Sequence, residues 1–406
     1  MLVAVAALGI RLAAAVSAED FLVQGDAFVF HHVAQGVADG QGFHVLGGPA
    51  PTAEHPPGWE IMLAAADLVG ANGYFSHRLL GTLLGTMTVV LIGLLGRAVA
   101  TPAVGLLAAA LAAVHPLLWS ADVSLMSETL YGAFLVGALL AAHRRSPLAL
   151  GALLGLAALT RGEALALVVL LVVALFWRQW RAMALAVGAF VLVLAPWTVR
   201  NLVTFEKPVL ISNNASGVWA GANCPSSYYG DVIGSWRFQC YTAPHPGDDE
   251  SEHFARQRDQ GVDYMVDNLG RLPAVMVARL ARLADVWRVE QAVFIAAQEG
   301  RLTRATRWGI RLEWMVYLLA AAGIVIQRRR RGPLLVLLAP IAMVVLVALA
   351  TYGSTRFRYA AEPVLCVLAA VAVSAAWPRL RTRITQFHVA SSRKPGTRVI
   401  HDNRGQ

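Results

Sequence analysis

The side chains best suited to chemistry in this sequence are charged and polar groups that border or interrupt long apolar segments. Such groups are costly to place at a membrane, so they commonly mark functional sites. A carboxylate can remove a proton from a hydroxyl group or bind a divalent cation, and an arginine binds phosphate with a planar fork of donors. The candidates are Asp26, Glu54, His55, Arg78, Glu128, Arg161, Glu163, Arg200, Asn201, Arg356 and Arg358.

Several of these residues also have a structural interpretation. Asp26 could cap a surface helix, because aspartate is a favoured N-cap residue. Glu128 could be a solvated helix start. Arg161 and Glu163 could simply pair with each other at a turn, and Arg200 could anchor a helix end at the membrane interface.

The elements that carry these residues are predicted to be membrane helices. Of the 406 residues, 57% are hydrophobic and 15% are charged, whereas a soluble domain has roughly 25% charged residues. Apolar runs of about 20 residues cross a membrane as helices that satisfy their own backbone hydrogen bonds. The segments are 2–18, 78–97, 101–118, 128–143, 147–160, 163–177, 182–198, 309–327, 333–351 and 359–376. We therefore expect an all-α integral membrane protein with about ten transmembrane helices.

The first segment is the weakest of the ten. It contains Arg11 and ends in Val16-Ser17-Ala18, which resembles a signal-peptidase site. It has no basic leader, which argues against a cleaved signal peptide. A start codon upstream of Met1 would explain the short segment equally well.

The basic residues predict the orientation of the chain. The formal net charge is +9, and the arginines lie mostly at helix ends and in the tail, where they set topology. They alternate with ten spans, which places both ends in the cytoplasm. We expect an N-terminal transmembrane module at 1–198 with a first outer loop at 19–77. An extracytoplasmic region at 199–308, C-terminal transmembrane helices at 309–376 and a basic cytoplasmic tail at 377–406 follow.

Both large outer loops have recognisable features. The first contains two amphipathic stretches, 26–38 and 57–68, which we expect along the membrane surface. The second, before the eighth helix, contains Cys224 and Cys240. These two cysteines are a candidate disulfide if the loop faces an oxidising compartment, and two free thiols are the alternative.

Arg356 and Arg358 lie in a short loop opposite the basic loops. Because they depart from the positive-inside pattern, they indicate an anionic partner on the outer side. Carboxylates and arginines that gather at this boundary suit a substrate with an anionic head and an apolar tail.

In their order along the chain, these motifs resemble those of the GT-C membrane glycosyltransferases, especially the branch with aminoarabinose transferases and protein O-mannosyltransferases. Each motif is short, but the ordered set is fairly specific for the superfamily and poorly specific for the substrate. The matching segments, within residues 19–365, are Asp26, Glu54-His55-Pro56-Pro57-Gly58, Arg78-Leu79, Ser127-Glu128, Thr160-Arg161-Gly162-Glu163, Trp197 through Arg200-Asn201, and Arg356-Phe357-Arg358.

The resemblance implies an inverting transfer of a sugar from a polyprenyl-phosphate donor to a lipid, glycan or protein acceptor outside the plasma membrane. It implies that Asp26 is the general base and that Glu128 orients the acceptor or supports a divalent cation. The family often has lysine before Pro-Pro, where it meets the lipid phosphate, but here that position is His55. The arginines expected to bind the phosphate instead are Arg78, Arg200, Arg356 and Arg358.

Two other classes of function stay open. A transporter or flippase for lipid-phosphate-linked substrates would usually show paired halves and helices interrupted at mid-membrane, which the sequence does not show. A non-catalytic assembly subunit would tolerate loss of Asp26 and Glu128, whereas an enzyme would not.

Overall fold

A computed structural model describes residues 1–19 and 22–376 of the chain. The predicted basic tail at 377–406 lies outside the described residues. Within the described part, the secondary structure is helical, apart from an isolated β-bridge between His44 and Pro51. The expectation of an all-α protein is therefore confirmed.

The apolar helices of the described chain follow the ten predicted segments in order. They are α1 (Leu2–Ser17), α4 (Tyr74–Val99), α5 (Pro102–Val114) with α6 (Pro116–Asp122), α7 (Glu128–His143), α8 (Pro147–Ala158), the broken element Gly162–Phe176, α11 (Trp180–Thr204), α17 (Thr303–Arg329), α18 (Leu334–Ala350) and the last helix, Glu362–Ala376.

Length and composition allow three of these described helices, α4, α11 and α17, to cross a membrane by themselves. The pair α5 and α6 makes a fourth if it is counted as one span. The pair bends by 62°, because Pro116 cannot donate the backbone hydrogen bond that would continue α5. The remaining apolar helices are shorter, so the number of ten crossings stays a prediction.

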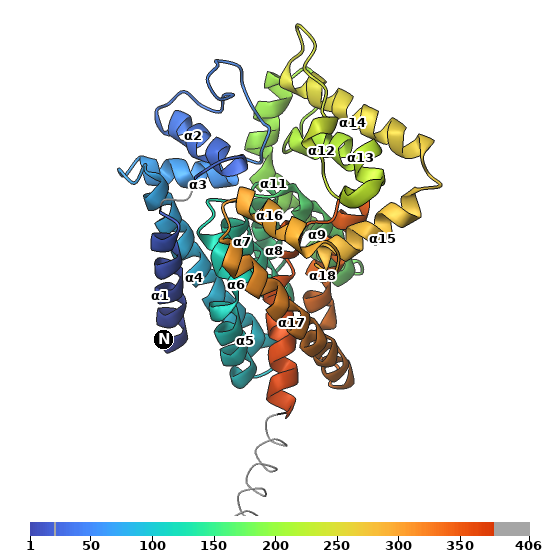
Figure 1. Cartoon of the computed structure of the whole chain (residues 1–406). Helices are drawn as coiled ribbons and strands as arrows, with labels where there is room; N and C mark the ends of the chain where they lie inside the picture. The colour runs from blue at the N-terminus through green and yellow to red at the C-terminus, as the bar shows by residue number, and fades with distance from the viewer. Residues whose placement is uncertain (20–21, 377–406) are drawn as a thin grey trace, which may run out of the picture.

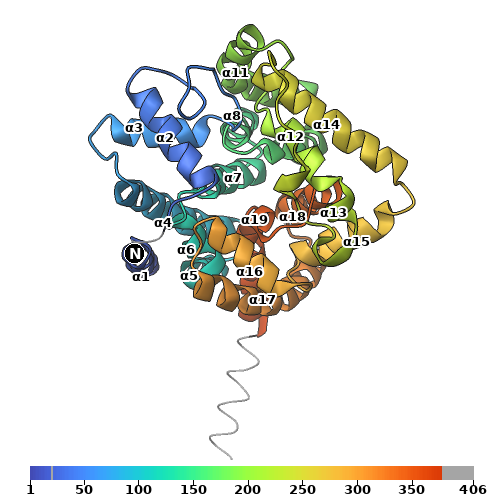
Figure 2. The ribbon, with the colours of Figure 1, turned by 45° about the horizontal axis from the view of Figure 1, so that its top comes forward.

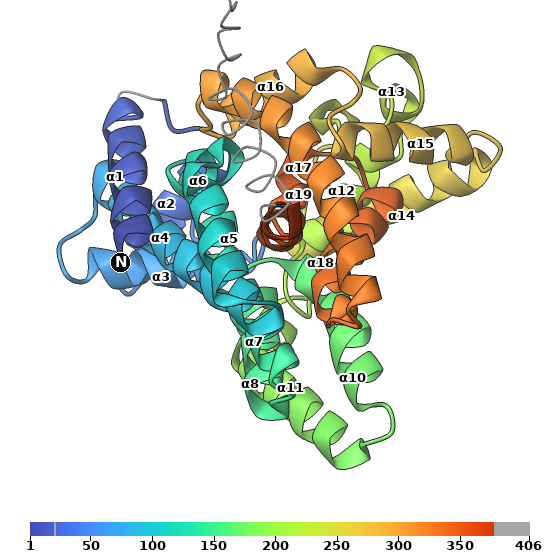
Figure 3. The ribbon, with the colours of Figure 1, turned by 90° about the horizontal axis from the view of Figure 1, so that it is seen from below.

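Small residues allow the bundle helices to pack closely. A Cβ atom at Gly151 of α8 would lie 1.9 Å from the carbonyl oxygen of Ala186 on α11. A Cβ atom at Gly323 of α17 would lie 2.1 Å from the carbonyl oxygen of Leu368 on the last helix. Such close approach of backbones is typical of helix packing in membranes. Figure 3 shows α8 beside α11, apart from α17 and α18.

Arg11, the charged residue within the first predicted membrane segment, is buried inside the bundle. Arg11 Nε donates to Asp122 Oδ2 at 2.7 Å, and each side chain is 1% exposed. The Tyr359 hydroxyl donates to the other oxygen of Asp122 at 3.2 Å. These contacts tie α1 to α6 and to the start of the last helix.

Shorter helices form a layer over one end of the bundle (Figures 1 and 2). The first loop supplies α2 (Asp26–Ala38) and α3 (Gly58–Asp67), which match the predicted amphipathic stretches. A disulfide joins Cys224 to Cys240. The one-turn helix α19 (Thr355–Arg358) connects α18 to the last helix. The second outer region contains α12 (Asn214–Ala222), α13 (Pro225–Tyr228), α14 (Glu250–Asp267), α15 (Leu272–Leu283) and α16 (Val289–Gln298).

Candidate active site

A cavity of about 1260 Å³ is lined both by the helix bundle and by the layer of shorter helices. Residues of the first loop and α2, of the 126–163 region, of α12 and the loop after it, of α15 and α16, and of the segment from α18 to α19 line it. Elements distant in sequence therefore meet at one site. A charged cluster and an aromatic group dominate its wall.

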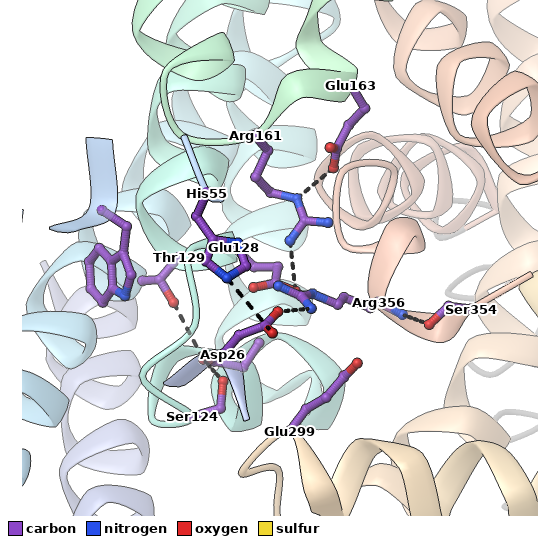
Figure 4. A network of polar contacts seen from close by, with 12 residues as sticks. Asp26, His55, Ser124, Glu128, Thr129, Arg161, Glu163, Glu299, Ser354 and Arg356 are labelled. Atoms are coloured by element: carbon purple, nitrogen blue, oxygen red, sulfur yellow. Dashed lines mark hydrogen bonds and ion pairs between the residues drawn. The ribbon is translucent and has the colours of Figure 1, made fainter. Parts of the chain in front are cut away.

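Arg356 of α19 lies at the centre of the charged cluster (Figure 4). Its Nη1 donates to Asp26 Oδ2 at 2.7 Å, and its Nε donates to Glu128 Oε1 at 2.5 Å. The expected base and the second expected carboxylate thus share one guanidinium group. Charge-assisted contacts of this kind are stronger and more directional than those between neutral groups.

Glu128 is the first residue of α7, is 1% exposed and lies behind Arg356. Arg161 Nη1 is 3.0 Å from the same Glu128 oxygen and also binds Glu163 through its Nε at 2.5 Å. Arg301 Nη2 approaches that oxygen at 3.6 Å. One buried carboxylate therefore holds three arginines, and a buried charge needs such pairing.

Asp26 is held by the start of α2 and faces the cavity. The residue before it, Gly25, has φ 59° and ψ −141° and occupies the N-cap position, a conformation that favours glycine. Asp26 thus begins the helix, and its carboxylate binds Arg356 and is 33% exposed. Burial raises the pKa of Asp26, but attraction to Arg356 and His55 outweighs it and lowers that pKa to about 2. Asp26 is therefore ionised at neutral pH.

Glu54 and His55 line the same cavity. His55 Nε2 lies 4.0 Å from Asp26 Oδ1 and also 4.0 Å from Glu54 Oε1. Burial raises the pKa of Glu54. His55 acts in the opposite direction, and the negative charges of Glu250 and Asp26 raise that pKa further. The pKa of Asp26 is thus lowered while the pKa of its neighbour Glu54 is raised. Pairs of carboxyl groups with pKa values shifted apart recur in acid–base sites.

Another contact joins two of the predicted motifs. The backbone N–H of Gly58, after Pro56-Pro57, donates to the carbonyl oxygen of Leu159 at 2.6 Å. A Cβ atom at position 58 would lie 2.7 Å from that oxygen. Glycine therefore allows the first loop to approach the turn that carries Arg161.

The aromatic group follows the disulfide-bonded segment. The rings of Trp236 and Tyr241 lie 5.6 Å apart, and Phe238 stacks on Tyr241 at 5.8 Å. Tyr352 contacts Trp236 on one side and Phe357 on the other. All five residues line the cavity, so it presents broad apolar faces beside its charges.

Some of the predicted substrate-binding residues contact protein groups away from this cavity. Arg78 Nη1 donates to the backbone of Glu19 at 3.2 Å. Arg200 donates to the carbonyl oxygen of Thr52 at 2.9 Å and to Asn201 Oδ1 at 3.0 Å. Arg200, with Asn201 beside it, therefore contacts the first loop. Neither Arg78 nor Arg200 lines the cavity, and their expected role in phosphate binding stays a prediction.

Arg358 also points away from the cavity, into a sealed cluster. Arg358 Nε donates to Glu362 Oε1 at 2.8 Å. Within the described chain, His115, Glu313 and Glu362 form the group of metal-ligating type, with ligand atoms within 4.8 Å of one another. A metal site also needs a route in from solvent, and all three residues are buried. We assign the cluster to helix packing.

The charged cluster at the cavity supplies its own positive charge. Both Asp26 and Glu128 are bound by Arg356. A divalent cation at these carboxylates would compete with that guanidinium group, so the residues present do not favour the expected cation support by Glu128.

Sequence reasoning missed Arg301, Glu299 and the aromatic group. Arg301 and Glu299 lie in the turn between α16 and α17 and line the cavity. No local pattern distinguishes them from other residues of a polar outer loop. Burial raises the pKa of Glu299, and this effect outweighs the positive charges of Arg356 and Arg301, which lower that pKa.

No protein-family model matches the sequence, and no curated protein matches it either. Solved structures do match in fold. The oligosaccharyltransferase of Archaeoglobus fulgidus, in complex with zinc and sulfate, aligns with a TM-score of 0.55 and 14% identity over 95% of this chain and 51% of that chain. Its apo form aligns with a TM-score of 0.52 and 13% identity over 97% and 53%.

ArnT from Cupriavidus metallidurans, bound to undecaprenyl phosphate, aligns over 97% of this chain and 81% of its own, with 16% identity and a TM-score of 0.40, which is too low to support an argument. This chain spans about half the length of the oligosaccharyltransferase. Identities this low show the fold alone. The chain therefore shares its fold with this membrane oligosaccharyltransferase, which agrees with the fold that its ordered motifs predicted.

Proposed function

We propose that this chain is an inverting glycosyltransferase that moves a hexosyl or pentosyl group from a polyprenyl-phosphate donor to a lipid, glycan or protein acceptor on the outer face of the plasma membrane. One observation carries the proposal. Asp26 is ionised, faces a large cavity and is held by Arg356 against Glu128. The GT-C fold supports the same class of reaction.

The chemistry follows from these positions. The oxygen of an acceptor hydroxyl group attacks the anomeric carbon of the donor sugar, and its proton passes to an oxygen of Asp26. The bond from the anomeric carbon to the phosphate oxygen breaks on the opposite face, and the electron pair leaves with the polyprenyl phosphate. Attack from the opposite face inverts the anomeric carbon. Arginines at the cavity stabilise the charge on the leaving phosphate.

Arg356 gives Asp26 a way to become a better base when the donor binds. Without a ligand, Arg356 contributes to the pKa of about 2 of Asp26, which is low for proton abstraction near neutral pH. A donor phosphate is a competing anion for the same guanidinium group. As Arg356 turns toward the phosphate, its hold on Asp26 weakens and the pKa of Asp26 rises.

The remaining cavity wall suits the other parts of the substrates. Val347 and Ala350 at the end of α18 and Phe294 of α16 line it, which suits an isoprenoid chain. The rings of Trp236 and Tyr241 offer flat faces to sugar rings. We assign the region 199–308 to the acceptor side, with the disulfide holding part of its wall.

The test is release of polyprenyl phosphate from short-chain polyprenyl-phosphate sugars by the purified protein in detergent. Asp26→Asn keeps the shape of the side chain and removes its ability to accept the proton. We expect a loss of about 100-fold or more in kcat, the scale of a positioned general base. Asp259→Asn is the matched control, because Asp259 is 62% exposed in a surface ion pair.

Each outcome has a clear meaning. Activity in wild type and in Asp259→Asn, but not in folded Asp26→Asn, supports the enzyme and its base. Equal activity in all three overturns the role of Asp26. A protein that transports a labelled donor across vesicles without releasing polyprenyl phosphate overturns the enzyme in favour of a flippase.

A further inference from the structure

Helix α19 is a single turn that carries Arg356 to the cavity. Four residues cannot hold a helix together by themselves, because nucleation of a helical turn is unfavourable. The position of Arg356 therefore depends on what holds α19 from outside. The structure shows several such contacts on the face of α19 formed by Thr355 and Arg358, which are three residues apart and share one side of the turn. One of them, from Arg358 to Glu362, has been described above.

Asp285 holds both ends of α19. The Thr355 hydroxyl donates to Asp285 Oδ1 at 2.7 Å, and Arg358 Nη1 donates to Asp285 Oδ2 at 2.7 Å. Arg358 Nη1 also donates to the carbonyl oxygen of Leu283 at 2.9 Å. Each oxygen of one carboxylate thus binds a different end of the turn.

Asp285 lies in the turn that ends α15. Asp285 has a φ of 53°, in the left-handed region that often ends a helix and that aspartate adopts more readily than most residues with side chains. Its side chain is 1% exposed. Both oxygens of this buried carboxylate bind α19, so its contacts point to a role in holding that turn.

Arg356 leaves the same turn toward other partners. Its guanidinium group binds Asp26 and Glu128, while Thr355 and Arg358 bind Asp285. One turn of helix therefore connects the outer layer at α15 to the charged cluster of the cavity.

We propose that Asp285 is a positioning residue, which fixes α19 through Thr355 and Arg358 and so holds the Arg356 guanidinium group between Asp26 and Glu128. The proposal rests on the proposed function for its consequence in catalysis, but the contact itself can be tested without activity. It assigns a task to a residue that touches neither the cavity nor a substrate.

The test compares matched variants of the whole protein. Asp285→Asn keeps the shape and removes the charge that binds Arg358. Thr355→Val removes only the hydroxyl group and is the milder variant if Asp285→Asn fails to fold, while Thr355→Ser keeps that group. The control is Asp231→Asn, because Asp231 lies in a nearby surface ion pair with Arg288 and its side chain is 73% exposed.

The first measurement is amide hydrogen exchange of the peptide that covers 352–360. We expect faster exchange there in Asp285→Asn and Thr355→Val, with α4 peptides unchanged, and wild-type exchange in Thr355→Ser and Asp231→Asn. Unchanged exchange at 352–360 in both folded test variants would overturn the proposal. This result stands whether or not any donor is turned over, so it separates the two proposals.

The second measurement is kcat together with the pH dependence of kcat/KM, whose acidic limb reports the groups of the free enzyme, before donor phosphate competes for Arg356. We expect kcat to fall roughly 10- to 100-fold in Asp285→Asn, the scale of a small misplacement of a catalytic group. The acidic limb should move to higher pH, because a displaced Arg356 no longer lowers the pKa of Asp26. A purely structural loss would lower the amount of active protein without moving the limb. The charged and titratable groups that face Asp26 are Arg356, Arg161, His55, Glu54, Glu299, Tyr241 and Tyr352.

Asp285→Asn could show faster exchange at 352–360 while its acidic limb stays in place. That result would overturn the catalytic part of the proposal and support only the contact between Asp285 and α19. Wild-type protein that turns over no polyprenyl-phosphate sugar would instead count against the proposed function.

Discussion

Two pairings of arginine and aspartate in this protein have the same chemistry and different surroundings. At the cavity, Arg356 binds Asp26, whose side chain is 33% exposed. Inside the bundle, Arg11 binds Asp122 at the same 2.7 Å, with each side chain 1% exposed. The open pair can exchange partners with a ligand, whereas the enclosed pair can only hold helices together.

The comparison indicates that the exposure of an ion pair decides whether its loss affects mainly the reaction or mainly stability. Breaking an enclosed pair leaves an uncompensated charge and is costly in stability. Breaking a pair at a cavity exposes the remaining charge to solvent or substrate, so its main effect falls on chemistry. The predictions below test this division.

The largest effect is expected from Arg356→Ala. The change removes the group that binds both Asp26 and Glu128, and loss of one stabilising donor at a reaction centre costs about 10²- to 10³-fold in kcat. Release of polyprenyl phosphate measures it. The thermal midpoint should fall less than in the bundle variant below, because Arg161 and Arg301 still pair with the buried Glu128. A kcat close to wild type would contradict the assignment of the site.

Asp122→Ala should act in the opposite way. It leaves Arg11 buried without its partner, which typically costs about 3–5 kcal/mol of stability. Thermal denaturation in detergent measures the loss, and activity per folded molecule should stay near wild type. The double variant Arg11→Met/Asp122→Ala should recover much of the stability, and a double variant as unstable as the single one would refute the pairing argument.

Removal of the disulfide tests the outer layer by itself. Cys224→Ser/Cys240→Ser should cost about 2–4 kcal/mol, which is typical for such a cross-link, and should loosen the segment that carries Trp236 and Tyr241. Limited proteolysis should cut this region faster while the bundle stays protected. KM for the acceptor should rise more than kcat falls, and an equal loss in both would indicate a wider role.

The smallest effect concerns pH. The pKa of Asp26 is lowered from 3.8 to about 2 in the folded protein, so its pair with Arg356 contributes stability that is fully present above pH 3.8 and is lost as pH falls toward 2. The difference in thermal midpoint between wild type and Asp26→Asn should therefore be constant from pH 8 to 5 and shrink below pH 4.

Much of the fold was predictable because helix-forming apolar runs are local signals. Each predicted segment has a helical counterpart, and the bend between α5 and α6 falls at Pro116, which sequence rules would allow. The number of crossings was less predictable, because several of these helices are shorter than a bilayer requires.

The site was predictable where residues belong to an ordered set of motifs. Asp26 and Arg356 are 330 positions apart and bind directly, which motif order anticipated and spacing alone did not. Arg358 shows the limit of this reasoning. It stands two residues from Arg356 yet faces a sealed cluster, because the two side chains leave the single turn of α19 in different directions. That turn is invisible in the sequence pattern.

The role of Asp285 could not be predicted from the sequence, for a related reason. Its partners Thr355 and Arg358 lie 70 and 73 residues away, and a lone aspartate after an amphipathic helix looks like any solvated helix end. Only the three-dimensional contact distinguishes it.

The bond between Cys224 and Cys240 also bears on how the protein would mature in the proposed orientation. Disulfides persist in oxidising compartments and are kept reduced in the cytosol. A newly inserted chain can therefore pack its apolar helices before the outer wall around Trp236 is secured. If the region 199–308 faces an oxidising compartment, as we propose, loss of thiol oxidation should leave the packed bundle with the cavity wall around Trp236 unfastened.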